Sequence, residues 1–392
     1  MMRELKTTSK TNIFFIKTMK TKFFLSAAVM TVALFSSCSN ETNGPNVGQT
    51  GTLKLTVTGT PVSRATGTLP KQTIENTVSM ITVGLFDHNT HVTTSITEVS
   101  DPTTLASGTI TIDNVPTSTT QDVVVVANTA SGTFKGLSTL DAFRAKTLTL
   151  AQTASNLPMS GENVTGTAIT ASPVATANVT ISRLVARVQL ASVKTDFSST
   201  GVYANASFKL DSVFVYNVNG TSAVGILSTG TQLATSNLLY GYGMKVGSDI
   251  VPAATGLFDA LSPSQDITST AYTTNYYYYT FENYYPGGIT DTNKQTATKL
   301  VLAGTFYPDK GDVSKSYHVY YPVVVNRDLT GTVIDNSTVK NTGIQRNNIY
   351  SITAVISGIG ASSPAAFIEP ASLKVNITIS DWNLTVGQTV NF

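Results

Sequence analysis

The fold class is decided near the C-terminus by Leu373-Lys374-Val375-Asn376-Ile377-Thr378-Ile379, in which apolar and polar residues alternate strictly. A period of two puts all the apolar side chains on one face of an extended chain, so this stretch predicts a half-buried strand. A second strand is predicted just before it, in Arg346-Asn347-Asn348-Ile349-Tyr350-Ser351-Ile352-Thr353-Ala354-Val355-Ile356-Ser357-Gly358-Ile359-Gly360, which opens with a polar turn and closes with glycines.

The same alternation occurs near the other end of the chain. Thr52-Leu53-Lys54-Leu55-Thr56-Val57-Thr58 places Leu53, Leu55 and Val57 on one face, which again predicts a half-buried strand. Between the two ends, the continuous apolar run of residues 122–128 predicts a central strand that is buried on both faces. Further strands are predicted at 78–86, 109–112, 176–180, 184–190, 206–217, 298–306 and 316–325, and one helix is predicted over 137–150.

Composition agrees with an all-β protein. The chain has 392 residues, of which 41% are hydrophobic and only 12% are charged. Thr, Val, Ser and Ala dominate where a helical protein would use Glu, Lys and Leu. The length is sufficient for two β-sandwich domains with minor helix, and we place the boundary between them near 181–183.

Composition also argues against several functions. One Cys and three scattered His leave little material for a metal site or for acid–base chemistry, so we expect no metal, no cofactor and no enzymatic activity. A glycosidase would need a pair of carboxylates in a cleft, and Asp and Glu are thinly spread. Counted from Ala65, the chain has 17 Lys and Arg against 21 Asp and Glu, a net charge of −4 that is unsuited to nucleic acid.

The N-terminal residues predict an export signal. Six basic residues lie among the first 22, an apolar run extends from Phe23 to Phe35, and small residues then lead to Cys38. This order is typical of a secretory signal, and the apolar run is short for a membrane-spanning helix. The Cys lies where a lipobox would place it, although Phe35 stands where Leu is usual. An ordinary signal peptide with an incidental Cys is the alternative, and translation can start at Met1 or at Met19.

Two features further along remain open on the residues alone. Arg64 lies in a loop of Gly, Pro, Ser and Thr, which is where an Arg-specific protease could cut, although most arginines in surface loops have no such role. Residues 276–286 form a dense tyrosine cluster that can bind carbohydrate, or can serve strand packing and subunit contacts. A carbohydrate-binding surface lipoprotein is therefore the alternative function.

The order of these motifs resembles the major fimbrillins (FimA-type) of Bacteroidia, the subunits of type V pili. The resemblance rests on the lipoprotein signal, the strand before Arg64, the Val-Val-Ala-Asn-Thr run at 125–129, the Arg-x-x-Ala-Arg-Val segment at 183–188 and the closing Asp381-Trp382. It implies two transthyretin-like β-sandwich domains in tandem. It also implies an outer-membrane precursor lipidated at Cys38, cleavage between Arg64 and Ala65 by an Arg-specific protease, and other fimbrial subunits as partners. The membrane is then contacted only through the precursor lipid.

The resulting organisation has four parts. Residues 1–37 are the signal peptide, 38–64 the lipidated tether with the propeptide strand, 65–182 the N-terminal domain, and 183–392 the C-terminal domain with a donor segment. Losing the strand of Leu53, Leu55 and Val57 would open an apolar groove, and a C-terminal strand of another subunit would fill it. Candidate donor residues are Leu373, Val375, Ile377, Ile379, Trp382, Leu384, Val386 and Val390.

Overall fold

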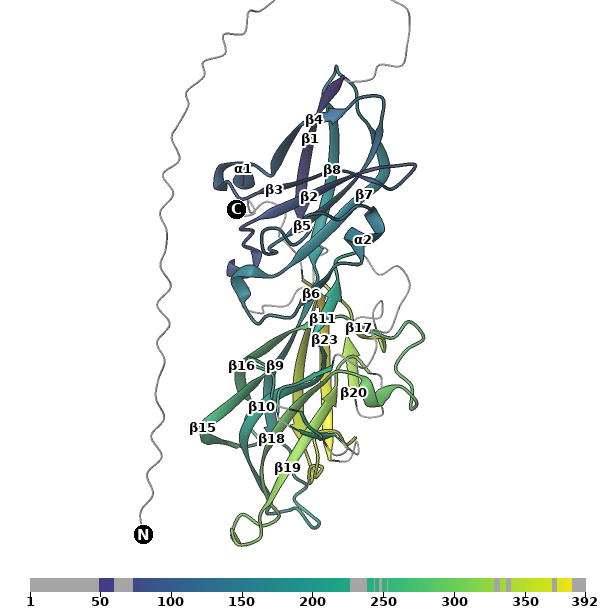
Figure 1. The fold of residues 1–392 in the computed structure, drawn as a ribbon. Helices are drawn as coiled ribbons and strands as arrows, with labels where there is room; N and C mark the ends of the chain where they lie inside the picture. The colour runs from purple at the N-terminus through teal and green to yellow at the C-terminus, as the bar shows by residue number, and fades with distance from the viewer. Residues whose placement is uncertain are drawn as a thin grey trace, which may run out of the picture. The chain divides into compact units, whose positions relative to one another are not determined.

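The computed structural model describes residues 49–59, 73–225, 238–242, 244–246, 249–251, 253–327, 332–335, 340–368 and 372–382 (Figure 1). Nearly all of its regular elements are strands, and the described helices are short: η1 (Thr73–Asn76), α1 (Pro102–Ser107), α2 (Leu140–Arg144), η2 (Ala154–Asn156) and η4 (Lys294–Thr296). The prediction of an all-β fold with minor helix is confirmed. None of the helices in these ranges is long and apolar enough to span a membrane.

Seven strands between residues 50 and 183 form one continuous sheet in the order β3-β2-β5-β7-β8-β1-β4. Their bounds are β1 (Thr50–Gly59), β2 (Ile81–Asp87), β3 (Thr93–Val99), β4 (Thr109–Pro116), β5 (Thr120–Ala127), β7 (Met159–Ala168) and β8 (Ala175–Arg183). Strands β7 and β8 pair only through Met159 with Arg183 and Ser160 with Ser182. The sheet therefore turns at this point, so that β8-β1-β4 packs face to face against β3-β2-β5-β7 as a sandwich with one shared core.

Strand β5 shows how the sequence builds this part. Val123 and Val125 point into the sandwich core, whereas Val124 and Val126 pack with Phe86, Phe134 and Phe143 on the opposite face. All four valines are at most 2% exposed, which confirms the prediction of a strand buried on both faces.

The predicted helix over 137–150 is shorter than expected. Thr139 caps α2 by accepting a hydrogen bond from the Ala142 backbone N–H, but α2 ends at Arg144. Thr147–Thr149 instead forms strand β6, which pairs with β11 (Thr221–Ala223). Threonine is β-branched, so its χ1 angle is restricted and it favours an extended backbone. In residues 147–149 this preference outweighs the helical pattern of apolar residues.

The strands from residue 185 onward form two five-stranded sheets. One has the order β12-β10-β18-β19, with β15 also pairing with β10, and the other has the order β16-β9-β22-β23-β20. The bounds in the first sheet are β10 (Ser207–Asn219), β12 (Leu238–Tyr240), β15 (Phe258–Ile267), β18 (Lys299–Tyr307) and β19 (Tyr317–Val324). In the second they are β9 (Val185–Thr195), β16 (Tyr272–Phe281), β20 (Thr332–Asp335), β22 (Asn348–Ile356) and β23 (Leu373–Asp381). Two short pairs join β13 (Met244–Val246) with β14 (Asp249–Val251) and β17 (Asn283–Tyr284) with β21 (Gly343–Ile344).

The two five-stranded sheets share a single large core. Side chains from β9, β16, β22 and β23 meet side chains from β10, β18 and β19 in it, so this part is also a β-sandwich. The pairing of β10 with β18 shifts by one residue between Leu210 and Ser212, so a bulge interrupts this pair of strands.

Candidate assembly site

Strand β1 carries the three residues of the predicted displaced strand, and it lies inside its sheet. It pairs antiparallel with β4, where Leu55 faces Ile110, and parallel with β8, where Leu55 faces Ala177. Leu53 and Leu55 are 0% exposed and Val57 is 4% exposed, and all three belong to the sandwich core. The outward residues of β1 are partly or fully exposed, which confirms the half-buried strand expected from the alternation.

Because β1 lies between β4 and β8, its removal would leave a gap between these two strands. Strands β4 and β8 would stand about 10 Å apart, since neighbouring strands are spaced by about 4.8 Å. Both would then present unpaired backbone groups to the gap, over a core stripped of three side chains. Each of those side chains contributes about 1.5–3 kcal/mol through burial.

The side chains on the exposed face of β1 make only weak contacts with the neighbouring strands. Thr52 donates a hydrogen bond of 2.8 Å to the Asp113 carboxylate, and the Thr58 and Thr180 hydroxyl oxygens lie 3.2 Å apart. These are surface contacts of small net value. Burial and the two backbone ladders therefore account for most of the hold on this strand.

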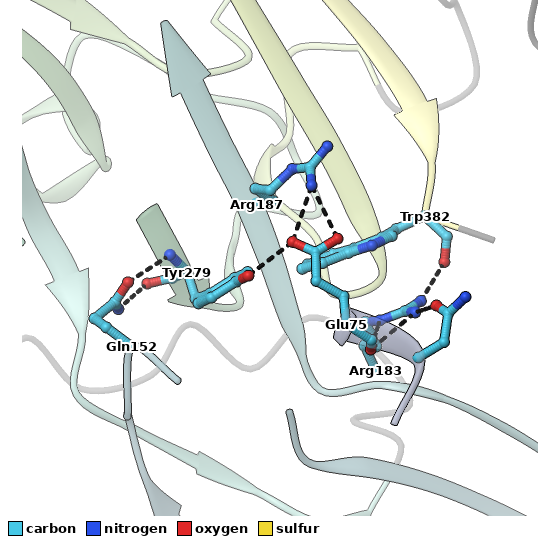
Figure 2. Close-up of polar contacts among 7 residues, drawn as sticks. Glu75, Gln152, Arg183, Arg187, Tyr279 and Trp382 are labelled. Carbon is cyan, nitrogen blue, oxygen red and sulfur yellow. Dashed lines mark hydrogen bonds and ion pairs between the residues drawn. The ribbon is translucent and has the colours of Figure 1, made fainter. Parts of the chain in front are cut away.

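The next described residues after β1 begin a buried cluster of charged and aromatic groups, shown in Figure 2. Glu75 of η1 is 2% exposed. Its two carboxylate oxygens each accept a hydrogen bond of 2.9 Å from Nη1 of Arg187, and Oε1 accepts another of 2.7 Å from the Tyr279 hydroxyl. Burial, together with this hydrogen bond to Glu75, raises the pKa of Tyr279 above its usual range, so the phenol stays protonated.

Arg183, the last residue of β8, connects η1 to Trp382, the residue that follows β23. It donates hydrogen bonds to the Glu75 carbonyl oxygen and the Asn76 side-chain oxygen, and its Nη1 donates to the Trp382 carbonyl oxygen at 2.8 Å. Its guanidinium also lies 4.7 Å from the centre of the Trp382 ring. Burial lowers the pKa of Arg183 to about 10, which leaves it charged at neutral pH.

Trp382 completes the cluster from the end of β23. Its ring stacks on Tyr279, with centroids 5.6 Å apart and an interplanar angle of 12°. Its backbone N–H donates to the Asn347 carbonyl oxygen at 2.7 Å. Trp382 is therefore fixed through both its ring and its backbone, directly before residue 383. We call Glu75, Arg183, Arg187, Tyr279 and Trp382 the buried ionic cluster.

Sequence reasoning anticipated part of this cluster. The Arg-x-x-Ala-Arg-Val segment on which the family resemblance partly rests supplies both arginines, Arg183 and Arg187, and Arg187 pairs with Glu75. Glu75 itself was not singled out. The available signal was that it is the only acidic residue between Arg64 and Asp87.

The C-terminal donor candidates fall into two groups. Leu373, Val375, Ile377 and Ile379 are at most 6% exposed in β23, which is bonded on one side to β22 and on the other to β20. They fill the core of their own part of the chain. Leu384, Val386 and Val390 lie outside the described residues, as do Cys38, Arg64 and Ala65.

The tyrosine cluster is mostly core. Tyr278, Tyr279, Phe281 and Tyr285 are at most 2% exposed, so residues 276–286 do not form an aromatic ladder on the surface. In the described part of the chain, no group of three or more His, Cys, Asp or Glu side chains is placed to hold a metal ion.

Comparison with known proteins identifies relatives of this chain. The family model of the major fimbrial subunit protein (FimA) matches residues 50–202. The major fimbrium subunit FimA type-2 of Porphyromonas gingivalis is 38% identical over 74 residues, which is 19% of this chain and 19% of that protein. The predicted resemblance to the FimA-type fimbrillins is confirmed. That family consists of structural fimbrial subunits, and the chain aligns with about a fifth of the length of this relative.

Solved structures extend the likeness of fold along most of the chain. A fimbrilin (FimA) from Porphyromonas gingivalis W83 superposes with a TM-score of 0.59 at 19% identity, covering 87% of this chain and 100% of that one. A candidate cell adhesion protein from Bacteroides eggerthii superposes with a TM-score of 0.63 at 24% identity, covering 87% and 99%. The FimA-type fold therefore includes both sandwiches.

Proposed function

We propose that this chain is a structural subunit of a surface fimbria, exported as a lipoprotein, cleaved after Arg64 and polymerised by exchange of a β-strand. The observation that carries the proposal is the place of β1. It is an interior strand of the sandwich, yet its covalent connection to the other strands of that sandwich runs through residues 60–72, which include Arg64. A single cut there would leave β1 held by non-covalent contacts alone.

Cleavage would then act as a timing step. While β1 is attached, the ladders of β4 and β8 and the core beneath them are covered, so the precursor has no open strand edge at this position during export. After the cut, a strand from another subunit can replace β1, because it would pair with the same two backbone edges. The processing protease would need Arg specificity.

The incoming strand is assigned to Asn383–Phe392 of a neighbouring subunit. This segment has ten residues, as many as β1, and its Leu384, Val386 and Val390 share one face of an extended chain. Strand β23 is less suited, because withdrawing it would open the core of its own sandwich. Burial of three such side chains contributes about 1.5–3 kcal/mol each before the cost of ordering the segment.

Two variants test the assembly step. Arg64→Ala should leave a folded precursor that an Arg-specific protease does not process and that stays monomeric. Deletion of Leu384–Phe392 should leave a folded chain that is cleaved normally but forms no fibres by electron microscopy. Fibres of normal length from the truncated chain would show that this segment is not the donor.

The lipid anchor has its own test. Cys38 is the only cysteine, so Cys38→Ala removes the one thiol that can form a thioether with a lipid. Metabolic labelling with palmitate should disappear, and the chain should not reach the outer membrane. Unchanged labelling would contradict the lipobox assignment.

A further inference from the structure

A pocket of about 580 Å³ lies beside strand β16, and none of its lining residues belongs to β1. Three partly exposed tyrosines line it, Tyr272, Tyr276 and Tyr277, together with the Asp259 carboxylate from β15. Because β16 ends one five-stranded sheet and β15 belongs to the other, the pocket opens where both sheets of this sandwich present an outer strand. Its volume lies within the usual range for a small-molecule site.

The backbone of β16 is unsuited to accept a further strand here. Its pairing with β9 shifts by one residue between Thr273 and Tyr276, so a bulge interrupts the regular ladder, and the Thr274 hydroxyl is turned back to donate to the Leu190 carbonyl oxygen. At Tyr279 the backbone groups on the outer edge of β16 are already hydrogen-bonded to a side chain. The Gln152 side-chain amide donates to the Tyr279 carbonyl oxygen at 2.6 Å and accepts from its N–H at 2.8 Å. A bulge and an occupied edge both disfavour strand addition, which argues against an extended peptide as the ligand.

The charge of the lining argues against an anionic ligand. Asp259 is the one charged side chain among the lining residues, and no Lys, Arg or His accompanies it. A phosphate, sulfate or carboxylate would therefore meet a negative charge with no cation to offset it.

The remaining chemistry suits a neutral polyhydroxylated ring. A sugar presents apolar C–H faces and hydroxyl groups together, and a tyrosine offers an apolar ring with a polar end. Asp259 supplies acceptor oxygens for ligand hydroxyls, and Thr273 and Asn275 are exposed polar side chains at the rim. Tyr272 and Tyr276 pack partly against the sandwich core, so their rings are held in place before any ligand arrives.

We propose that this pocket is a binding site for a neutral saccharide, with Tyr272, Tyr276 and Tyr277 contacting its ring faces and Asp259 accepting hydrogen bonds from its hydroxyls. The site goes beyond the proposed role in assembly and is independent of it. A fimbrial subunit with this site would carry a glycan contact on each copy.

Binding can be measured on the unassembled chain by calorimetry and saturation-transfer NMR. The probes are four neutral oligosaccharides of different linkage: maltotetraose, cellotetraose, xylotetraose and lacto-N-tetraose. At least one should bind. Tyr272→Ala and Asp259→Asn should each weaken that binding at least tenfold, while the far-UV circular dichroism and a cooperative unfolding transition show that each variant is folded. Tyr317→Ala removes a tyrosine that is 51% exposed and does not line the pocket, and it should bind like the unmodified chain.

Three results would overturn the proposal. They are the absence of binding by all four probes, binding that survives both pocket substitutions, and preferential binding of choline, which would identify a cation site built from the same tyrosines and carboxylate. The pocket variants should still be cleaved and should still polymerise. Loss of polymerisation in every variant would concern the assembly proposal and not the saccharide site.

Discussion

Strands β1 and β23 are held in closely similar ways. Each alternates buried apolar with polar residues, and each lies between two neighbours, one antiparallel and one parallel. For β1 the neighbours are β4 and β8, and for β23 they are β22 and β20. Leu55 of β1 and Ile377 of β23 are both 0% exposed.

The two strands differ in what fixes their ends. Strand β23 runs directly into Trp382, whose ring stacks on Tyr279 and whose carbonyl oxygen accepts a hydrogen bond from Arg183. The described residues of β1 have no comparable anchor, and the chain continues from Gly59 into the segment that holds Arg64. Strands of similar burial therefore differ in how their ends are attached, and under the proposed assembly step it is the strand without the anchor, β1, that leaves.

Arginine-specific proteolysis should produce the largest contrast between the two ends. In the folded precursor we expect one dominant cut after Arg64, giving a product that begins Ala65-Thr66-Gly67. Arg183, Arg187 and Arg327 are at most 7% exposed, and Arg144 and Arg346 are paired with Glu162 and Glu282. N-terminal sequencing of the product decides the matter. Early cuts at Arg183 or Arg187 with Arg64 intact would contradict the assignment of the loop.

Glu75→Ala should strongly destabilise the anchored end. It leaves Arg187 buried without its carboxylate partner, and breaking a buried ion pair in this way costs about 3–5 kcal/mol. Urea unfolding followed by Trp382 fluorescence measures the loss. Asp266→Ala is the matched control, because Asp266 is 69% exposed and its contact with Lys209 is 3.7 Å. It should cost less than about 1 kcal/mol. Equal effects of the two substitutions would show that the buried ionic cluster does not hold this end.

The sequence allowed strands β1 and β23 to be predicted more completely than the buried ionic cluster, which anchors the end of β23 and not that of β1. Alternation is a local signal, so the burial of Leu55 and Ile377 followed from a few neighbouring residues. The pairing of Glu75 with Arg187 joins residues 112 positions apart. Glu75 lies in a short 3-10 helix with no periodic pattern, so nothing local indicates its partner.

The tyrosines illustrate a similar limit. Their density in residues 276–286 was visible, but the bulge at Thr273–Tyr276 helps decide which rings reach the pocket and which enter the core. A register shift depends on the partner strand, which the local sequence does not specify. For this reason the sequence left carbohydrate binding and strand packing both open for these residues, whereas the structure contains a buried cluster with a small pocket at one end.

Alkaline pH should destabilise the C-terminal sandwich more than the N-terminal one, because residues 49–183 contain no tyrosine. Burial raises the pKa of Tyr278, Tyr279, Tyr321 and Tyr350 above the usual range. The unfolded chain releases these protons near pH 10 while the folded chain keeps them, so the free energy of unfolding falls above that pH, by about 1 kcal/mol per tyrosine at pH 11.

One group in the same sandwich opposes this trend. Burial lowers the pKa of Lys299 to about 8, so between pH 8 and its unfolded value near 10.5 the unfolded chain binds the extra proton and stability rises with pH. The buried tyrosines outnumber this one lysine, so from pH 9 to 11 the free energy of unfolding should fall by several kcal/mol in the C-terminal part and by much less in the N-terminal part. Urea unfolding followed by the methyl NMR signals of Ile377 and Leu55 tests this difference. Equal losses at both methyl groups would contradict it.

The comparison of β1 with β23 is sharpest for Leu55→Ala and Ile377→Ala. Both remove fully buried branched side chains, and each should destabilise the precursor by about 3 kcal/mol in urea unfolding. After cleavage at Arg64 under native conditions, with no step that strips off the N-terminal peptide, the chain that carried Leu55→Ala should match the cleaved unmodified chain, because the altered residue leaves with β1. The chain with Ile377→Ala should keep its full deficit, since β23 remains in its sheet. If the cleaved Leu55→Ala chain stays less stable than the cleaved unmodified chain, β1 has not left, and cleavage alone does not free the groove for another strand.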